Sequence, residues 1–150
     1  MKIIVDADAC PVKQIIENSS QKHNLKLIMV SNYHHQIKSD YASVVVVDSA
    51  SQAADLVIVN LTDAGDIVVT QDYGLAAMIL GKNAYVIHPM GNIYTSENIE
   101  GLLMQRYVNQ KARQANKRTS GPRKRNSSDD LRFEQELENL ISQCENIQIN

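Results

Sequence analysis

The sequence contains no tryptophan, one phenylalanine and two cysteines among its 150 residues. A core without tryptophan has to be filled mainly by aliphatic side chains. Cys10 and Cys144 lie near opposite ends of the chain and do not form the spacing of a disulfide framework, so we expect a reduced, cytoplasmic protein. No apolar run approaches the roughly 18 residues of a membrane span, and the N-terminal pattern is not that of a secretory signal.

Arginine is absent before position 106, and the charge is unevenly distributed. Residues 1–95 carry a net charge of −3, residues 106–125 carry +8, and residues 126–150 carry −5. A basic block of this kind favours RNA or another polyanion as a partner, although a solvated helix face and a loop explain it equally well. A membrane partner is not expected, and a homodimer is compatible with the sequence. The candidate phosphate-binding side chains are Arg106, Arg113, Arg123, Lys124 and Arg125.

Short apolar runs alternate with helical patterns over the first ninety residues. Because these runs are continuously apolar, we expect strands of a mostly parallel sheet that is covered by helices on both faces. The predicted fold is therefore a three-layer α/β/α domain with about five strands, followed by C-terminal helices. The expected strands are Lys2–Val5, Leu25–Val30, Ser43–Val47, Ile67–Thr70 and Ala84–Ile87.

The helices are expected from apolar spacing and from cap residues. Pro11 suits the first turn of one helix, Ser49 or Ser51 can cap the next, and Gly74–Leu80 forms a short one. One domain is expected over residues 1–118, a basic loop over 119–128, and a last helix over 129–145 packed on the same domain. The long helix over 96–118 would bury Ile99, Leu102, Leu103, Tyr107 and Val108, and the last helix would bury Leu131, Phe133, Leu137, Leu140 and Ile141.

Four aspartates fall where the carboxyl ends of parallel strands should meet. Asp6 ends the first strand, Asp8 follows it, Asp72 lies just past the fourth strand, and Asp55 is in the first turns of the helix after the third. Ligands of open parallel sheets bind at this edge, whereas Asp66 precedes its strand and belongs to the opposite edge. Carboxylates brought together repel each other, and Mg²⁺ or Mn²⁺ relieves that repulsion. Asp6, Asp55 and Asp72 are therefore candidate metal ligands, and Asp6, Asp8 and Asp72 are candidate catalytic residues.

Each carboxylate except Asp6 also has an ordinary structural interpretation. Asp8 can cap the helix that begins at Pro11, Asp55 can complement a helix dipole, and Asp72 can cap the short helix after it. Four further polar residues, at the same strand ends or on the first helix, could contact substrate, although turn chemistry or a surface position explains them at least as well. They are Lys13, Ser31, Asn32 and Thr70.

Several segments of the sequence carry a recognisable pattern. They are DADACPVK at 6–13, AAD at 53–55, GDIVVTQD at 65–72, GNIYT at 91–95, Arg106, and the 121–122 loop near Phe133. In these segments the chain resembles the YaiI/YqxD family of bacterial proteins, whose function is not established and which is similar to the PIN-like nuclease superfold. The resemblance implies a parallel sheet whose acidic edge binds Mg²⁺ or Mn²⁺ to cut RNA. Family members often carry an acid where this chain has Gln52, and some carry one where it has Leu56. This departure implies a weaker metal site or binding without cleavage.

The sequence is compatible with three functions. The first is a divalent-metal-dependent nuclease acting on RNA or another phosphodiester, and the second is a nucleic-acid- or ribosome-associated binding protein without catalysis. The third is a phosphatase of the haloacid-dehalogenase type, which also begins with a strand and Asp-x-Asp. It ranks last because Cys10 stands where that family has threonine and no later segment offers its lysine and acidic pair.

Overall fold

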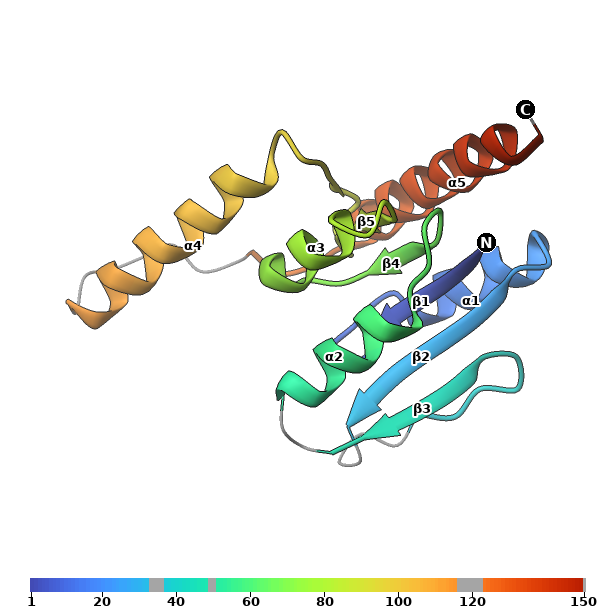
Figure 1. Ribbon diagram of the computed structural model, residues 1–150, viewed down its shortest axis with the longest axis horizontal. Coiled ribbons are helices and arrows are strands. Elements are labelled where there is room, and N and C mark those ends of the chain that lie inside the picture. Colours follow the sequence, from blue (N-terminus) through green and yellow to red (C-terminus); the bar gives the residue numbers. More distant parts are fainter. Residues whose placement is uncertain (33–36, 49–50, 116–122, 150) are drawn as a thin grey trace.

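A computed structural model describes residues 1–32, 37–48, 51–115 and 123–149, without the side chains of 51–52 and 148–149. Six strands of this described part form one sheet in the order β3-β2-β1-β4-β5-β6. Figure 1 labels the first five of them along the chain. All neighbouring strands are parallel except β5 and β6. Their bounds are β1 Lys2–Asp6, β2 Lys26–Asn32, β3 Ser43–Val47, β4 Ile67–Val69, β5 Tyr85–Ile87 and β6 Ile93–Tyr94.

Five helices accompany the sheet in the described part of the chain, and four of them cover its two faces, which confirms the predicted three-layer α/β/α fold (Figure 1). They are α1 Lys13–Lys22, α2 Ser51–Leu61, α3 Tyr73–Leu80, α4 Ile99–Gln114 and α5 Ser127–Ile149. Helices α1 and α5 pack on one face, and α2 and α3 pack on the other. The sixth strand was not predicted, because two residues after the Gly91 turn are too few to show a strand pattern.

Alternation along the strands divides the core into two layers. On β1, Ile3 and Val5 face α1 and α5, whereas Ile4 faces α2 and α3. All three are completely buried, as are Val68 and Val69 of the neighbouring β4. Burial of both faces explains why these strands read as continuous apolar runs rather than as alternating ones.

Asp66 lies at the amino-terminal edge of the sheet, as predicted, and ties β1 to the start of β4. Its carboxylate accepts hydrogen bonds from the Lys2 backbone nitrogen at 3.0 Å and from Lys2 Nζ at 2.6 Å. The side chain of Asp66 is almost completely buried, so this cation offsets the cost of removing a carboxylate from water. The opposite edge of the sheet carries the candidate site.

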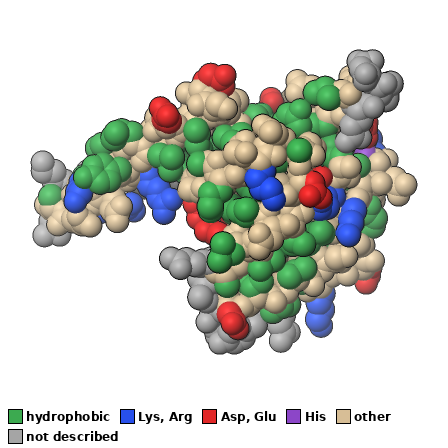
Figure 2. Space-filling view, viewed as in Figure 1, with side chains coloured by type: hydrophobic (Ala, Val, Ile, Leu, Met, Phe, Trp, Pro, Cys, Tyr) green, Lys and Arg blue, Asp and Glu red, His purple; other side chains and the backbone are tan. Residues whose placement is uncertain are grey.

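Some apolar side chains of the two C-terminal helices are exposed although the sequence predicted that they would be buried. Helix α4 projects away from the sheet and displays hydrophobic side chains along its length (Figures 1 and 2). Ile99 is buried, but Tyr107 and Val108 are each 55% exposed, so their predicted burial is wrong. Leu131 is also wrongly predicted, because it is 67% exposed and lies off the stripe that carries Phe133. Apolar spacing marks a helix face without showing whether another element covers it.

The expected boundary at residue 118, the expected cap Ser49 and the first residues of the basic loop lie outside the described residues. The last helix begins at Ser127, slightly earlier than expected, and extends past 145. Within the described ranges, no helix combines the length and apolarity that crossing a membrane requires.

Helix α5 belongs to the core through Phe133, which is completely buried. Phe133→Ala should lower the free energy of unfolding by about 3–5 kcal/mol, because it removes a large buried side chain and leaves a cavity. The matched control Leu131→Ala, on the exposed side of the same helix, should change it by less than about 0.5 kcal/mol. Urea denaturation measures both, and a larger loss for Leu131→Ala would contradict this packing.

Candidate functional site

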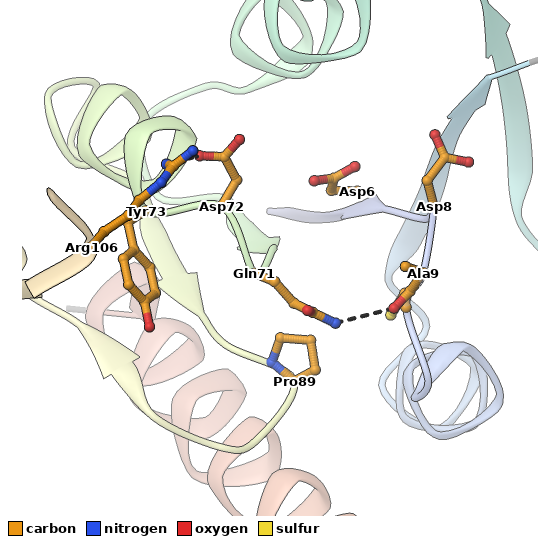
Figure 3. A pocket seen from close by; sticks show the side chains of 9 residues that line it. Asp6, Asp8, Ala9, Gln71, Asp72, Tyr73, Pro89 and Arg106 are labelled. Carbon is orange, nitrogen blue, oxygen red and sulfur yellow. Dashed lines mark hydrogen bonds and ion pairs between the residues drawn. The ribbon is translucent and has the colours of Figure 1, made fainter. Parts of the chain in front are cut away.

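The last residue of β1 and the segment that follows β4 line a cavity of about 280 Å³. The strand order runs from β1 towards β2 on one side and from β4 towards β5 on the other, so these two strands meet where the order reverses. Open α/β sheets bind ligands at this reversal. Figure 3 shows the carboxylates of Asp6, Asp8 and Asp72 around the cavity, with the Arg106 guanidinium beside Asp72. The remaining lining residues are Ala9, Cys10, Gln71, Tyr73 and Pro89.

Asp6 is the last residue of β1, and its carboxylate is largely withdrawn from solvent. Thr70 Oγ1 donates a hydrogen bond of 2.9 Å to Asp6 Oδ2. The pKa of Asp6 is raised from 3.8 to about 6, mainly by burial and also by the charges of Asp55, Asp8 and Asp72, whereas the Thr70 hydrogen bond lowers it. Ionisation of Asp6 at this edge therefore costs free energy.

Thr70 connects the two strand ends. Besides its bond to Asp6, its Oγ1 accepts a hydrogen bond from the Asp72 backbone nitrogen at 3.0 Å. The Tyr94 hydroxyl of β6 donates to the Thr70 carbonyl oxygen at 3.3 Å. The predicted Thr70 is thus brought to the site, where it holds Asp6 and the segment that carries Asp72.

Asp72 caps helix α3, as its ordinary interpretation predicted. Its Oδ1 accepts hydrogen bonds from the backbone nitrogens of Gly74 at 2.9 Å and Leu75 at 3.2 Å. Arg106 Nη1, from helix α4, lies 3.5 Å from the same oxygen. The cap and the cavity position are compatible, because all three contacts involve Oδ1 while the carboxylate faces the cavity (Figure 3).

Asp8 does not cap helix α1, so that interpretation is wrong. The helix begins at Lys13 after Val12, two residues later than the predicted start at Pro11. The Asp8 carboxylate instead accepts the Asn32 backbone N–H at 3.1 Å, which joins the loop after β1 to the end of β2. Asp8 also lines the cavity.

The loop that carries Asp8 is held from both sides. Gln71 Nε2 donates to the Ala9 carbonyl at 3.1 Å (Figure 3). Lys13 Nζ donates to the Cys10 carbonyl at 3.0 Å, so this predicted substrate contact here supports the loop. Ala9 has φ of +59°, a conformation that is strained for a residue with a side chain and that is often found near functional sites. The loop is fixed in one shape beside the cavity.

Asp55 lies near the cavity without lining it. It is half-buried on α2, and burial together with the charge of Asp72 raises its pKa. Leu56, where some family members carry an acid, is 62% exposed. The side chain of Gln52 lies outside the described part. The charge of Asp55 therefore interacts with the other predicted carboxylates. The carboxylates that line the cavity itself are those of Asp6, Asp8 and Asp72.

The residues that line the cavity suit a divalent ion held by few protein ligands better than one enclosed by protein ligands on all sides. Among the described side chains, no three acidic, histidine or cysteine groups are arranged closely enough to hold a metal together. Mg²⁺, however, is commonly held by one or two carboxylates and completes its shell with water and substrate phosphate. The carboxylate oxygens of Asp6, Asp8 and Asp72 around one open cavity suit that mode of binding.

The predicted basic residues separate into two groups. Arg106 reaches the cavity, and Arg113 lies farther along α4, where both line a shallow groove. Arg123 binds Asp129 with contacts of 2.6 and 2.9 Å, and Arg125 Nε binds Asp130 at 2.7 Å. These two arginines thus hold the start of α5 outside the cavity lining.

The other predicted substrate contacts lie apart from the cavity lining. Lys124 is exposed, Ser31 is buried at the end of β2, and the Asn32 backbone contacts Asp8.

Sequence reasoning did not single out Gln71, Tyr73 or Pro89 as cavity residues. Gln71 and Tyr73 flank Asp72, so their position directly after the fourth predicted strand was the available signal. Pro89 follows the fifth strand and approaches the cavity through the order of the sheet, which a single sequence does not reveal.

Comparison with known proteins now adds to this geometry. The model of the YaiI/YqxD family, described as an uncharacterised BCR, matches residues 4–143. The chain belongs to the YaiI/YqxD family. It is 49% identical over 141 residues to a UPF0178 protein from Clostridium kluyveri, covering 94% of this chain and 93% of that one. A UPF0178 protein from Natranaerobius thermophilus is 48% identical over 143 residues, covering 95% and 97%.

Among solved structures, Rae1 (YacP) from Bacillus subtilis in a mutant form is similar with a TM-score of 0.43 and 18% identity. The match covers 77% of this YaiI/YqxD chain and 84% of the Rae1 chain.

The pKa of Asp6 provides a direct test of the site. Titration followed by carboxyl ¹³C NMR should give a midpoint near 6 for Asp6. Thr70→Val should raise that pKa, because it removes a donor to the charged form, and Asp55→Asn should lower it, because it removes a like charge. The exposed Asp48 is the control, and Asp48→Asn should leave the midpoint unchanged. A midpoint close to 3.8 in the unaltered protein would contradict the burial described for Asp6.

Proposed function

We propose that this protein is a divalent-metal-dependent nuclease that acts on RNA or another phosphodiester, with Mg²⁺ or Mn²⁺ as its ion. The observation that carries this proposal is the meeting of Asp6, Asp8, Asp72 and Arg106 at one cavity above the switch point of the sheet. Carboxylates attract a hard cation, and a guanidinium beside them attracts a phosphate. Few substrates other than a phosphate ester require both charges in one small cavity.

A comparison within the chain supports a cation at Asp6. Asp66 is a buried carboxylate, and Lys2 Nζ lies 2.6 Å from it. Among the described residues, Asp6 has the Thr70 hydroxyl but no cationic partner, and its pKa is raised to about 6. A divalent ion would remove the penalty that burial and neighbouring carboxylates impose on the charged form.

Asp6 and Asp72 are the proposed principal ligands, and Asp55 would contribute through its charge or through water. When bound, the ion would supply activation of a water molecule and stabilisation of the leaving oxygen. Thr70 would keep Asp6 in place, Asp8 would orient water on the β2 side, and Arg106 would bind a nonbridging phosphate oxygen. Arg113 would neutralise a neighbouring phosphate without choosing a sequence.

A binding protein without catalysis is the second candidate. It is favoured by the lack of a three-ligand cluster among the described residues and by the neutral, exposed Leu56. The same cavity would then bind a nucleic-acid backbone, either free or at the ribosome, through Arg106 and a bridging ion without cutting it. A haloacid-dehalogenase-type phosphatase ranks third, because Lys13 Nζ binds the Cys10 carbonyl instead of approaching Asp6.

The test is cleavage of end-labelled single-stranded RNA by purified protein with Mn²⁺ or Mg²⁺. Asp6→Asn should lower the rate by at least about 100-fold, because it removes a ligand charge on which the activated water depends. Thr70→Val should have a smaller effect, since it keeps every carboxylate and disturbs only the pKa of Asp6 and the positions of Asp6 and Asp72. Asp48→Asn is the control and should retain the unaltered rate.

Binding of the same RNA separates the two leading candidates. Tight, salt-sensitive binding without cleavage in any divalent ion would overturn the nuclease proposal and support the binding protein. Cleavage that persists unchanged in Asp6→Asn would show that the activity arises elsewhere. Aspartyl-phosphate formation on Asp6 with a phosphate mimic would instead support the phosphatase.

A further inference from the structure

A second cavity, of about 490 Å³, lies next to the first, and Tyr73 lines both. Its volume falls within the roughly 300–1,000 Å³ typical of small-ligand sites. The walls come from the turn between β5 and β6, from β6, from the start of α4 and from α5. Its lining residues are Tyr73, His88, Gly91, Asn92, Ile93, Tyr94, Asn98, Leu102, Arg132 and Glu136.

Three rings gather on one side of this cavity. The Tyr73 and Tyr94 ring centroids are 5.8 Å apart in an edge-to-face arrangement, and those of His88 and Tyr94 are 6.1 Å apart. Tyr94 is buried, and its hydroxyl is held by the Thr70 carbonyl, so its ring is fixed as the base on which the other two rest. Tyr73 and His88 are only half-buried, which leaves ring surface for a planar ligand to stack against.

His88 is suited to be a neutral hydrogen-bond donor. Its Nδ1 accepts the Met90 backbone N–H at 2.9 Å, so the proton of the neutral ring is on Nε2. Burial and the positive charge of Arg125 lower the pKa of His88, which keeps the ring neutral near pH 7. A neutral ring stacks on a base without requiring a negative partner.

The polar side of the cavity offers both donors and acceptors. Arg132 Nη2 donates to Asn92 Oδ1 at 2.8 Å, which holds the helix α5 side chain against the turn before β6. Gly91 has φ of +95° and lets the turn approach Arg132 closely, since a Cβ there would lie 3.1 Å from Arg132 Cγ. Glu136, one helical turn after Arg132, adds a carboxylate to the same lining.

We propose that this second cavity binds a nucleobase of the substrate, next to the cavity that receives its phosphate. The inference rests on the proposed function for the acidic cavity and names the part of the substrate that gives it selectivity. A planar heterocycle matches stacking surfaces on one side and paired donors and acceptors on the other. Tyr73 directly follows Asp72 in the sequence, and the Tyr94 hydroxyl donates a hydrogen bond to the Thr70 carbonyl oxygen. The segment that follows β4 therefore connects the acidic cavity with the second cavity.

The test is an NMR titration of the ¹⁵N-labelled full-length protein with AMP, GMP, CMP and UMP, compared with ribose 5-phosphate. At least one nucleotide should shift the backbone amide signals of Asn92 and Tyr94, and ribose 5-phosphate should not. Glu136→Gln should weaken binding of that nucleotide by about tenfold, as loss of a charged hydrogen-bond acceptor implies. Arg132→Ala should act similarly, whereas Glu134→Gln, an exposed acid on the same helix, should have no effect.

Three results would each overturn the nucleobase site. Ribose 5-phosphate could shift the same signals as the nucleotides do, or no nucleotide could shift them. The third is that Glu136→Gln and Arg132→Ala bind the nucleotide as tightly as the unaltered protein does. Thermal unfolding of both variants ensures that a lost signal is not lost folding. Failure of the two proposals is distinguishable: nucleotide binding without RNA cleavage would overturn only the nuclease, and cleavage without these shifts would overturn only the nucleobase site.

Discussion

The Thr70 hydroxyl is the contact on which the candidate site depends. It donates to the Asp6 carboxylate at the end of β1 and accepts from the Asp72 backbone after β4, so one side chain fixes two strand ends against each other. The Tyr94 hydroxyl in turn holds Thr70 in place by donating a hydrogen bond to the Thr70 carbonyl oxygen. Because β1 and β4 meet where the strand order reverses, this small network places acidic groups at the point where such sheets bind ligands.

Asp66, which is buried, and Asp6, which is partly buried, illustrate the difference between a structural and a functional edge of the sheet. Asp66, at the amino edge, is neutralised by Lys2 and stabilises the start of two strands. Asp6, at the carboxyl edge, is surrounded by other carboxylates and has a pKa raised to about 6. A fold accepts such a cost most often where a ligand relieves it. Arg106 offers the complementary charge that a bound phosphate needs.

The sequence predicted the layered fold well, because continuous apolar strands separated by helices admit few other arrangements. It also predicted which edge Asp6 and Asp66 occupy, since each sits at a definite end of its strand. The exposed face of α4 was not predictable, because Tyr107 and Val108 follow the spacing of buried residues. Nor was the cavity that includes His88, Asn92 and Arg132, which depends on how α5 returns to the β5–β6 turn.

Binding of a divalent ion to Asp6 should displace the proton that this carboxyl group holds near its pKa. Calorimetric titration of Mn²⁺ at pH 6, in two buffers of different ionisation enthalpy, measures the ion and the proton together. With a pKa of about 6, Asp6 should release about half a proton per bound ion, and the release should vanish at pH 8 and in Asp6→Asn. Mn²⁺ binding without proton release at pH 6, or with equal affinity in Asp6→Asn, would contradict it.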